Sequence, residues 1–442
     1  MIRTVMKRAL SVLVLLYGLA ALGCGEEGSG ADAENSADLC GDGTDNDGDG
    51  DADCDDAECT AFCVDSEPPE WRTTWVASQY LVGSDGMPPP IPGMPGSTFR
   101  QNIQISIGGE QLRFTFSNEY GEVPLTIVSA GVARSLGRGA IDEQSHIPLA
   151  FSGESSVTIE ASEMATSDPV QWEVSPRADI AVSMLFDDSP PDRLTGHPGS
   201  RTTSNFEYGD AASSPTVSGS STVHWYFRSS VDVLTNAGSR AVAVLGNSIT
   251  DGYGSTTDGD DRWPDNLSRR LLENPGTEHV AVLNQGIGGN CLVNSCLGPQ
   301  GRDRFDRDVL NPLGVKWAII FEGINDLAYF ENLTAERFTN ALAYLAERAH
   351  DKGLTVIGGT IMPCEGHSHY SEDMEVKRQE INEWIRTTDI LDSFIDFDEI
   401  TRDPSSPTRL SPYVDGGDAL HPGPAGYQIM ADAIDLALFE ER

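Results

Sequence analysis

Two patterns of hydrophobic positions divide the sequence near Ser239. From Trp71 to about Val233, apolar and polar residues alternate in short stretches, and glycine, proline and serine separate the stretches. Alternation with period two is typical of half-buried strands, and many short strands indicate an antiparallel sandwich or jelly roll. We therefore predict a β-sandwich domain over residues 71–238.

The strands on either side of Gly108-Gly109 are predicted to form a hairpin. Ile103, Ile105 and Ile107 alternate with polar residues, Gly108-Gly109 follows, and the alternation resumes at residues 112–116. Two such stretches joined by a pair of glycines are a typical hairpin signal.

After Ser239, apolar strands alternate with amphipathic helices, as in the stripe of Phe338, Leu342 and Leu345 that follows a Thr334 cap. This alternation predicts an α/β domain with a parallel sheet over residues 239–442. The predicted strands cover residues 241–245, 280–284, 317–321, 355–359 and 394–397.

Polar clusters follow several of these strands, at the carboxyl edge where such sheets place their ligand sites. They cover residues 246–252, 284–290, 323–326 and 418–422. A serine in the first cluster needs a base to take its proton, the base needs an orienting carboxylate, and the oxyanion of acyl transfer needs fixed donors.

Ser248, His421 and Asp418 can fill the roles of nucleophile, base and orienting carboxylate. The backbone N–H groups of Ser248 and Gly289, with the side-chain amide of Asn325, can stabilise the oxyanion. This reading needs no metal or organic cofactor for catalysis.

The four clusters, in this order, resemble the SGNH (GDSL) hydrolase family. Residues 117–121 and 262–265 resemble a secreted bacterial branch in which a β-sandwich precedes the catalytic domain. The resemblance implies a three-layer α/β/α fold of the flavodoxin-like kind and carboxylic ester hydrolysis. It also implies that Ser248 is the nucleophile, that Gly289 and Asn325 belong to the oxyanion hole, and that Asp418 and His421 act together as the base.

One residue departs from the family pattern. Asn247 stands where the family usually has aspartate. Asparagine keeps the shape and most hydrogen bonds but lacks the charge, so we expect an effect on the turn or on the pKa of nearby groups and not loss of the nucleophile.

The first 23 residues predict export. Arg3, Lys7 and Arg8 precede an apolar run that is shorter than a bilayer span, which is typical of a signal peptide. The run ends in Ala21-Leu22-Gly23-Cys24, which resembles a bacterial lipobox, so Cys24 is predicted to carry a lipid anchor. Ordinary signal cleavage nearby is the alternative.

Residues 24–70 predict an acidic tether, since they contain no lysine or arginine. Aspartates in this segment have the spacing of a Ca²⁺-binding loop, with Gly50 at the position of the sharp turn. The candidate ligands are Asp45, Asp47, Asp49, Asp53 and Asp56. A purely solvating acidic run is the alternative.

The cysteines fit an oxidising compartment. Four lie in the tether, where three connectivities are open, and Cys291 and Cys296 are placed to close a small loop. Cys364 is expected to be a buried apolar residue. His367 and His369 lie nearby, and we interpret them as a polar loop near the site and not as metal ligands, because no further ligand set is apparent.

Charge narrows the classes of partner. The chain has 29 basic and 69 acidic residues, a net charge of −40, which disfavours nucleic acids and anionic membrane surfaces as partners.

The predicted substrate is a short-acyl ester, in particular acetylated carbohydrate at the cell surface, since no long apolar lid segment is evident. A lipase or lysophospholipase, and a surface carbohydrate-binding protein without turnover, are the alternatives.

Overall fold

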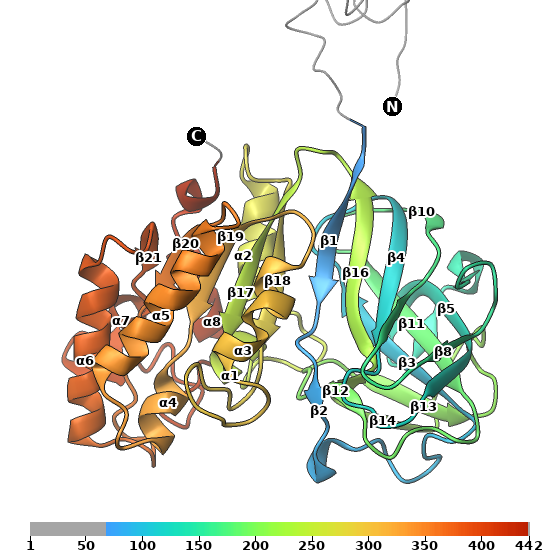
Figure 1. Cartoon of the computed structure of the whole chain (residues 1–442), viewed down its shortest axis with the longest axis horizontal. Helices are drawn as coiled ribbons and strands as arrows, with labels where there is room; N and C mark the ends of the chain where they lie inside the picture. Colours follow the sequence, from blue (N-terminus) through green and yellow to red (C-terminus); the bar gives the residue numbers. More distant parts are fainter. Residues whose placement is uncertain (1–67, 441–442) are drawn as a thin grey trace, which may run out of the picture. The chain divides into compact units, whose positions relative to one another are not determined.

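Antiparallel strands form the first part of residues 68–440, which are the residues that the computed structural model describes (Figure 1). One sheet has the order β1-β16-β4-β10, with β9 also paired to β4, and a second has the order β14-β13-β3-β11-β5-β6, with β7 and β8 also paired to β5. A third small sheet has the order β15-β12-β2. The strands are β1 Glu70–Val76, β2 Tyr80–Leu81, β3 Ser97–Gln104, β4 Gly109–Ser117, β5 Leu125–Gly137, β6 Ala140–Ile141, β7 Ile147–Pro148, β8 Val157–Ile159, β9 Met164–Thr166, β10 Val170–Val174, β11 Asp179–Phe186, β12 Thr195–Pro198, β13 Ser204–Tyr208, β14 Ser220–Thr222, β15 His224–Tyr226 and β16 Arg228–Thr235.

Aromatic residues fill the core of this β domain, by which we mean strands β1 to β16 and their connections. The Phe99 ring contacts Phe186 and Phe206 edge to face, with centroids 4.9 and 4.4 Å apart. Leu112 and Phe114 of β4, in the other large sheet, belong to the same buried cluster. Side chains of both sheets therefore share one core, which confirms the predicted sandwich.

The predicted hairpin at Gly108-Gly109 is wrong. Strand β3 pairs with β11 and β13, whereas β4 pairs with β16, β10 and β9, so the two strands lie in different sheets. The connecting residues cross between the sheets. The crossing needs glycine at position 108, because a Cβ there would lie 2.1 Å from the Val174 carbonyl oxygen. Alternation shows which residues of a strand face the core, but it does not show which strand is the neighbour.

A five-stranded sheet with the order β18-β17-β19-β20-β21 forms the centre of the second part. All its pairs are parallel, and numbered along the chain the order is 2-1-3-4-5, that of flavodoxin-like folds. The predicted fold class is confirmed. The strands are β17 Arg240–Gly246, β18 Val280–Gly286, β19 Val315–Phe321, β20 Thr355–Gly359 and β21 Ser393–Ile395.

Helices pack on this sheet to complete the α/β domain, by which we mean the chain from β17 onward (Figure 1). The predicted stripe on α5 is buried, with the Thr334 side chain accepting a hydrogen bond from the Arg337 N–H. The last strand is shorter than predicted, because Asp396 caps a helix that begins at Phe397. The helices are α1 Ser248–Asp251, α2 Trp263–Glu273, α3 Gly301–Phe305, α4 Ile324–Tyr329, α5 Ala335–His350, α6 Glu372–Thr387, α7 Phe397–Thr401 and α8 Pro424–Asp432, with a π-helical turn η5 at Asp306–Leu310, 3-10 turns η3 at Ser84–Gly86, η4 at Glu143–Ser145 and η6 at Leu436–Phe439, and a hairpin of β22 Arg402–Asp403 and β23 Ser406–Leu410.

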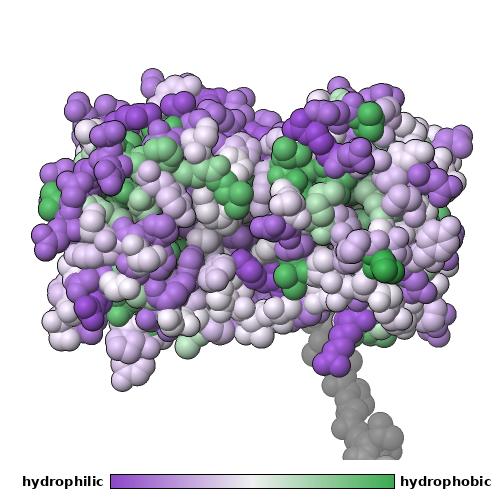
Figure 2. Space-filling model, turned by 90° about the horizontal axis from the view of Figure 1, so that it is seen from below, coloured by the Kyte–Doolittle hydropathy of each residue, from purple (hydrophilic) through white to green (hydrophobic). Residues whose placement is uncertain are grey.

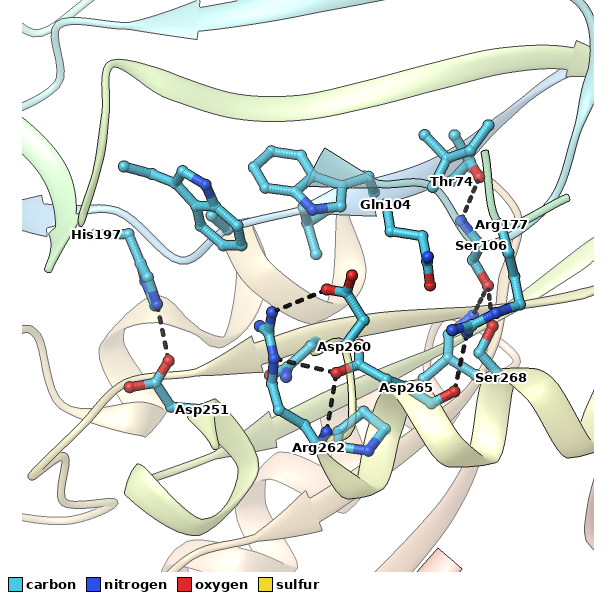
Figure 3. A pocket seen from close by; sticks show the side chains of 18 residues that line it. Thr74, Gln104, Ser106, Arg177, His197, Asp251, Asp260, Arg262, Asp265 and Ser268 are labelled. Atoms are coloured by element: carbon cyan, nitrogen blue, oxygen red, sulfur yellow. Dashed lines mark hydrogen bonds and ion pairs between the residues drawn. The ribbon is translucent and has the colours of Figure 1, made fainter. Parts of the chain in front are cut away.

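Polar side chains join the β domain to the α/β domain (Figure 3). His197 of β12 contacts Asp251 of α1, with Nε2 and Oδ1 2.9 Å apart and both side chains buried. The Ser106 hydroxyl contacts the Ser268 hydroxyl at 3.0 Å and accepts the N–H of Val282. These contacts surround a cavity of about 40 Å³. The α1 helix is therefore supported from the β domain as well as from its own sheet.

The cysteines of the described part behave as expected. Cys291 and Cys296 form a disulfide, and Cys364 is unpaired and buried.

The predicted signal peptide, the Cys24 anchor, the tether cysteines and the candidate calcium ligands lie outside the described residues. Within residues 68–440, no helix has the length and apolar character needed to cross a bilayer.

Candidate active site

Ser248 lies at the carboxyl end of the central strand β17. The strand ends at Gly246, and Asn247 caps α1 by accepting a hydrogen bond from the Ile249 N–H at 3.1 Å, so that Ser248 is the first helical residue. The helix packs closely on β18, because a Cβ on Gly286 would lie 2.3 Å from the Asp251 nitrogen. Ser248 is largely buried, with 7% of its surface exposed.

His421 and Asp418 reach Ser248 from the loop before α8. The Ser248 Oγ lies 2.8 Å from His421 Nε2, and His421 Nδ1 lies 2.7 Å from Asp418 Oδ2. A carboxylate can only accept, so Nδ1 carries the proton in the neutral ring and Nε2 is left to accept the serine proton. The structure thus brings the three predicted residues into one hydrogen-bonded chain.

The Asp418 carboxylate is held in its ionised form. Burial acts to raise its pKa, but the hydrogen bonds from the His421 backbone and ring and from the Leu420 N–H outweigh burial and lower the pKa. With its pKa lowered, the ionised Asp418 can orient the imidazole and stabilise the imidazolium that forms when His421 takes a proton.

The two other predicted donors line the same pocket as Ser248. The Asn325 side-chain nitrogen, on α4, donates to the Asn290 carbonyl oxygen at 2.8 Å, which leaves its second N–H for another acceptor. Gly289 has a φ of 71°, a conformation that suits glycine. The structure therefore gathers every residue of the predicted oxyanion site around Ser248.

A buried carboxylate holds the loop that follows Gly289. Asp326 accepts the N–H groups of Leu292 and Val293 at 2.7 and 2.9 Å. Burial raises the pKa of Asp326 to about 6, although these hydrogen bonds oppose the rise. The loop is thus fixed to α4, the helix that carries Asn325, which ties together the two segments that carry the predicted oxyanion donors.

The pocket around Ser248 has a volume of about 550 Å³ and walls from both domains. His367 and His369 line it, in agreement with their interpretation as a polar loop near the site. The lining residues from the α/β domain are Ser248, Asp251, Tyr253, Gly288, Gly289, Leu297, Asn325, Tyr329, His367, His369, Leu420 and His421, and those from the β domain are Tyr80, Gly83, Ser84, Asp85, Gly86, Pro198, Gly199, Arg201 and His224.

Sequence reasoning missed the wall from the β domain. Its residues come from three separate segments, at 80–86, 198–201 and 224, and nothing in their spacing shows that they meet. Trp263 and Tyr370 are not among the residues that line this pocket, and the Trp263 side chain is fully buried in the core.

Arg304 lies fully buried beneath the site and ties several loops together. Its guanidinium donates to the Gly246 carbonyl at 3.0 Å, just before the nucleophile, and to Asn290 Oδ1 at 3.0 and 3.1 Å. It also contacts Asp308 Oδ2 at 2.8 Å and lies 3.5 Å from Glu322 Oε1. One side chain therefore fixes the segments before Ser248 and after Gly289.

Glu322 is a buried residue whose carboxyl group contacts the side chain of Asn247. The Asn247 amide donates to Glu322 Oε2 at 3.1 Å. Burial raises the pKa of Glu322 to about 8, against the opposing effects of Arg304 and the Asn247 amide. Asparagine at position 247 is a natural partner here, because an aspartate would place a second carboxylate against Glu322.

The raised pKa of Glu322 predicts a pH-dependent loss of stability. In the unfolded chain this group ionises near its ordinary pKa, whereas in the folded protein it keeps its proton to about pH 8, so stability falls as pH rises between the two values. Glu322→Gln removes this effect, and we expect its free energy of unfolding, relative to wild type, to rise by about 3 kcal/mol from pH 5 to pH 8.

Urea denaturation at each pH measures this difference. The matched control is Glu380→Gln, an exposed residue of α6, whose difference from wild type should stay level. A level difference for Glu322→Gln would show that this carboxyl ionises as readily in the folded protein as in the unfolded chain.

No metal is suggested by the side chains of this region. Within residues 68–440, no three His, Cys, Asp or Glu side chains are grouped so that they could hold an ion.

Comparison with known proteins identifies the domain that carries this site. Residues 244–429 match the model of the GDSL-like Lipase/Acylhydrolase family, and the match includes all four polar clusters. The α/β domain is a GDSL-like acylhydrolase domain. The chain is accordingly a carboxylic ester hydrolase. A search of curated proteins finds no match to the chain.

Several solved structures similar to the GDSL-like domain each cover less than half of this chain. A GDSL-like lipase from Bacteroides thetaiotaomicron is 23% identical over 45% of this chain and 88% of its own, with a TM-score of 0.35. An aryl esterase from M. smegmatis is 17% identical over 44% and 96%, with a TM-score of 0.36. A carbohydrate acetylesterase from Sinorhizobium meliloti is 16% identical over 45% and 99%, with a TM-score of 0.35.

Proposed function

We propose that the protein hydrolyses short-acyl esters, in particular acetyl esters of carbohydrate, through an acyl-enzyme on Ser248. The observation that carries this proposal is the hydrogen-bonded chain from Ser248 through His421 to Asp418 inside a pocket lined mainly by polar and aromatic side chains.

Acylation follows from the geometry. The Ser248 Oγ attacks the ester carbonyl carbon while His421 Nε2 takes the hydroxyl proton, and Asp418 stabilises the imidazolium. The negative charge moves to the former carbonyl oxygen, where the N–H groups of Ser248 and Gly289 and the free N–H of the Asn325 amide stabilise it.

Departure of the alcohol completes acylation, and deacylation then uses the same groups. The tetrahedral intermediate collapses, the bond to the alcohol oxygen breaks, and His421 gives its proton to the departing alcohol. Water then attacks the acyl-enzyme carbonyl, His421 takes one of its protons, and the second collapse returns that proton to the Ser248 oxygen. The products are an alcohol and a carboxylic acid, and the enzyme regains its starting protonation.

The lining of the pocket favours a small acyl group and a polar alcohol. The aliphatic side chains that line it are Leu297, Leu420 and Pro198, whereas its other side chains are hydroxyl, imidazole, phenol, carboxylate, amide and guanidinium groups. A long acyl chain needs a continuous apolar channel. The face drawn in Figure 2 is mostly hydrophilic or neutral, and its hydrophobic residues form separate patches, unlike a broad lipid-docking surface.

A series of p-nitrophenyl esters tests the acyl preference. We expect kcat/KM to fall by about tenfold or more from the acetate to the octanoate, because Leu297, Leu420 and Pro198 are the only aliphatic side chains of residues 68–440 lining this pocket that the added methylenes can contact. Rates of p-nitrophenol release measure this order for residues 66–442, with chemical hydrolysis subtracted for each ester. A preference for octanoate over acetate would contradict the proposal and indicate lipid esters.

A further inference from the structure

Arg201 of the β domain lines the active-site pocket without a carboxylate partner. Among the described residues, no carboxylate lies within ion-pair distance of its guanidinium, and its Nε is buried without a hydrogen-bond partner. The guanidinium lies 5.0 Å from the centre of the Tyr253 ring, and that ring lies 4.4 Å from the His421 ring. The Arg201 guanidinium, which has unused donors, therefore packs on the Tyr253 ring, and that ring packs on the His421 ring beside Ser248.

The backbone that carries Arg201 is fixed in an unfavourable conformation. Arg201 has a φ of 56°, which costs free energy for a residue with a side chain. Asp258 of the α/β domain holds the segment, since its N–H donates to the Arg201 carbonyl at 2.9 Å and its carboxylate accepts from the Thr203 N–H and hydroxyl at 2.6 Å each. Arg201 is thus positioned before any ligand arrives.

His224 supplies a second donor to the same pocket. The Gly199 N–H donates to His224 Nδ1 at 2.8 Å, so the proton of the neutral ring lies on Nε2. Burial lowers the pKa of His224, which keeps the ring neutral near pH 7. A neutral N–H donor beside a guanidinium suits a carboxylate, because it adds a hydrogen bond without a second charge to desolvate.

The two acidic residues of the pocket do not occupy these donors. The Asp251 carboxylate is bonded to His197, and Asp85 is exposed and accepts the Ser84 hydroxyl at 3.1 Å.

We propose that Arg201 and His224 form an anion subsite in which the β domain binds the carboxylate of a uronic acid, so that the substrate is an acetylated, uronate-bearing carbohydrate. This inference rests on the proposed esterase function. The sparse aliphatic lining of the pocket favours a saccharide over a lipid as the carrier of the anion.

The test compares two esters that differ in charge, a monoacetylated methyl glucuronoside and its glucuronamide. Wild type should prefer the acid, and the ratio of kcat/KM for acid over amide should fall by about tenfold or more in Arg201→Gln, because a charge-assisted contact is lost. Arg201→Lys should keep part of the preference. The matched control is Arg138→Gln, an exposed arginine of the β domain whose φ is 52°, and its ratio should equal that of wild type.

Binding separates this inference from the proposed function. Calorimetry with the Ser248→Ala variant measures the affinity for the acetylated glucuronoside without turnover. Arg201-dependent binding without hydrolysis by wild type would reject the esterase and keep the subsite. An acid-to-amide ratio that is equal in wild type and Arg201→Gln would overturn the subsite. Calorimetry with lysophosphatidate, a lipid that carries a phosphate, gives a second check. If its binding depended on Arg201 and that of the glucuronoside did not, the subsite would also be overturned.

Discussion

Replacing Ser248 by alanine is expected to lower kcat/KM for p-nitrophenyl acetate by about 10⁴-fold or more. The variant keeps the pocket and the oxyanion donors, but it has no hydroxyl to form the acyl-enzyme. The loss should lie in kcat, since the ester is still bound. His421→Ala should cause a loss of similar size, and the double variant should lose little more, because the two residues act as one unit.

A matched control separates chemistry from folding. Ser255→Ala removes a hydroxyl seven residues later in the chain and outside the pocket lining, and it should keep wild-type rates. Thermal unfolding of Ser248→Ala should follow that of wild type within a few degrees, since no buried core is disturbed. If Ser248→Ala retained more than about 1% of the wild-type rate, Ser248 would not be the nucleophile.

Replacing Arg304 by methionine is expected to destabilise the fold by about 3 to 5 kcal/mol. Its guanidinium is fully buried and serves several acceptors, among them the Gly246 and Gln285 carbonyls at 3.0 and 2.6 Å. Methionine fills much of the volume but leaves these oxygens and the Asp308 carboxylate without their donor. Buried acceptors without partners cost more than the hydrogen bonds themselves contribute.

Urea denaturation of Arg304→Met and Arg302→Met compares two arginines of the same helix. The Arg302 side chain is 45% exposed, so its replacement should change the free energy of unfolding by no more than about 0.5 kcal/mol. Because Arg304 also fixes the segments that carry Ser248 and Gly289, the variant should lose activity even where it remains folded. Equal stability of the two variants would show that the buried network contributes nothing net.

The parts of the site that sequence could predict are those set by local rules. Ser248, Gly289 and Asn325 each follow a parallel strand, and the carboxyl ends of such strands meet at one edge of a sheet. His421 follows the last strand by a longer path, yet its motif with Asp418 is local, because a bond across three residues needs only a turn. The parallel sheet also follows from the alternation of strands and helices, whereas its strand order is implied by the family resemblance.

The parts that sequence could not predict depend on contacts between distant segments. Arg201 lies in a β-domain connection and His224 at the start of β15, and their approach to Ser248 depends on how the two domains pack. Arg304 has an exposed neighbour of the same type two residues earlier, and no periodicity in so short a helix distinguishes the buried arginine from the exposed one. The misplaced hairpin has the same origin, since strand partners are chosen by tertiary packing.

The bond between His197 and Asp251 bears on how such an enzyme can diversify. The helix that presents the nucleophile is braced by a strand of the neighbouring domain, and the loop that follows this strand carries Arg201 into the pocket. Changes in that loop can alter which ester is accepted while Ser248, His421 and Asp418 stay as they are. The same β-domain segment therefore both braces the helix that presents Ser248 and forms part of the pocket wall.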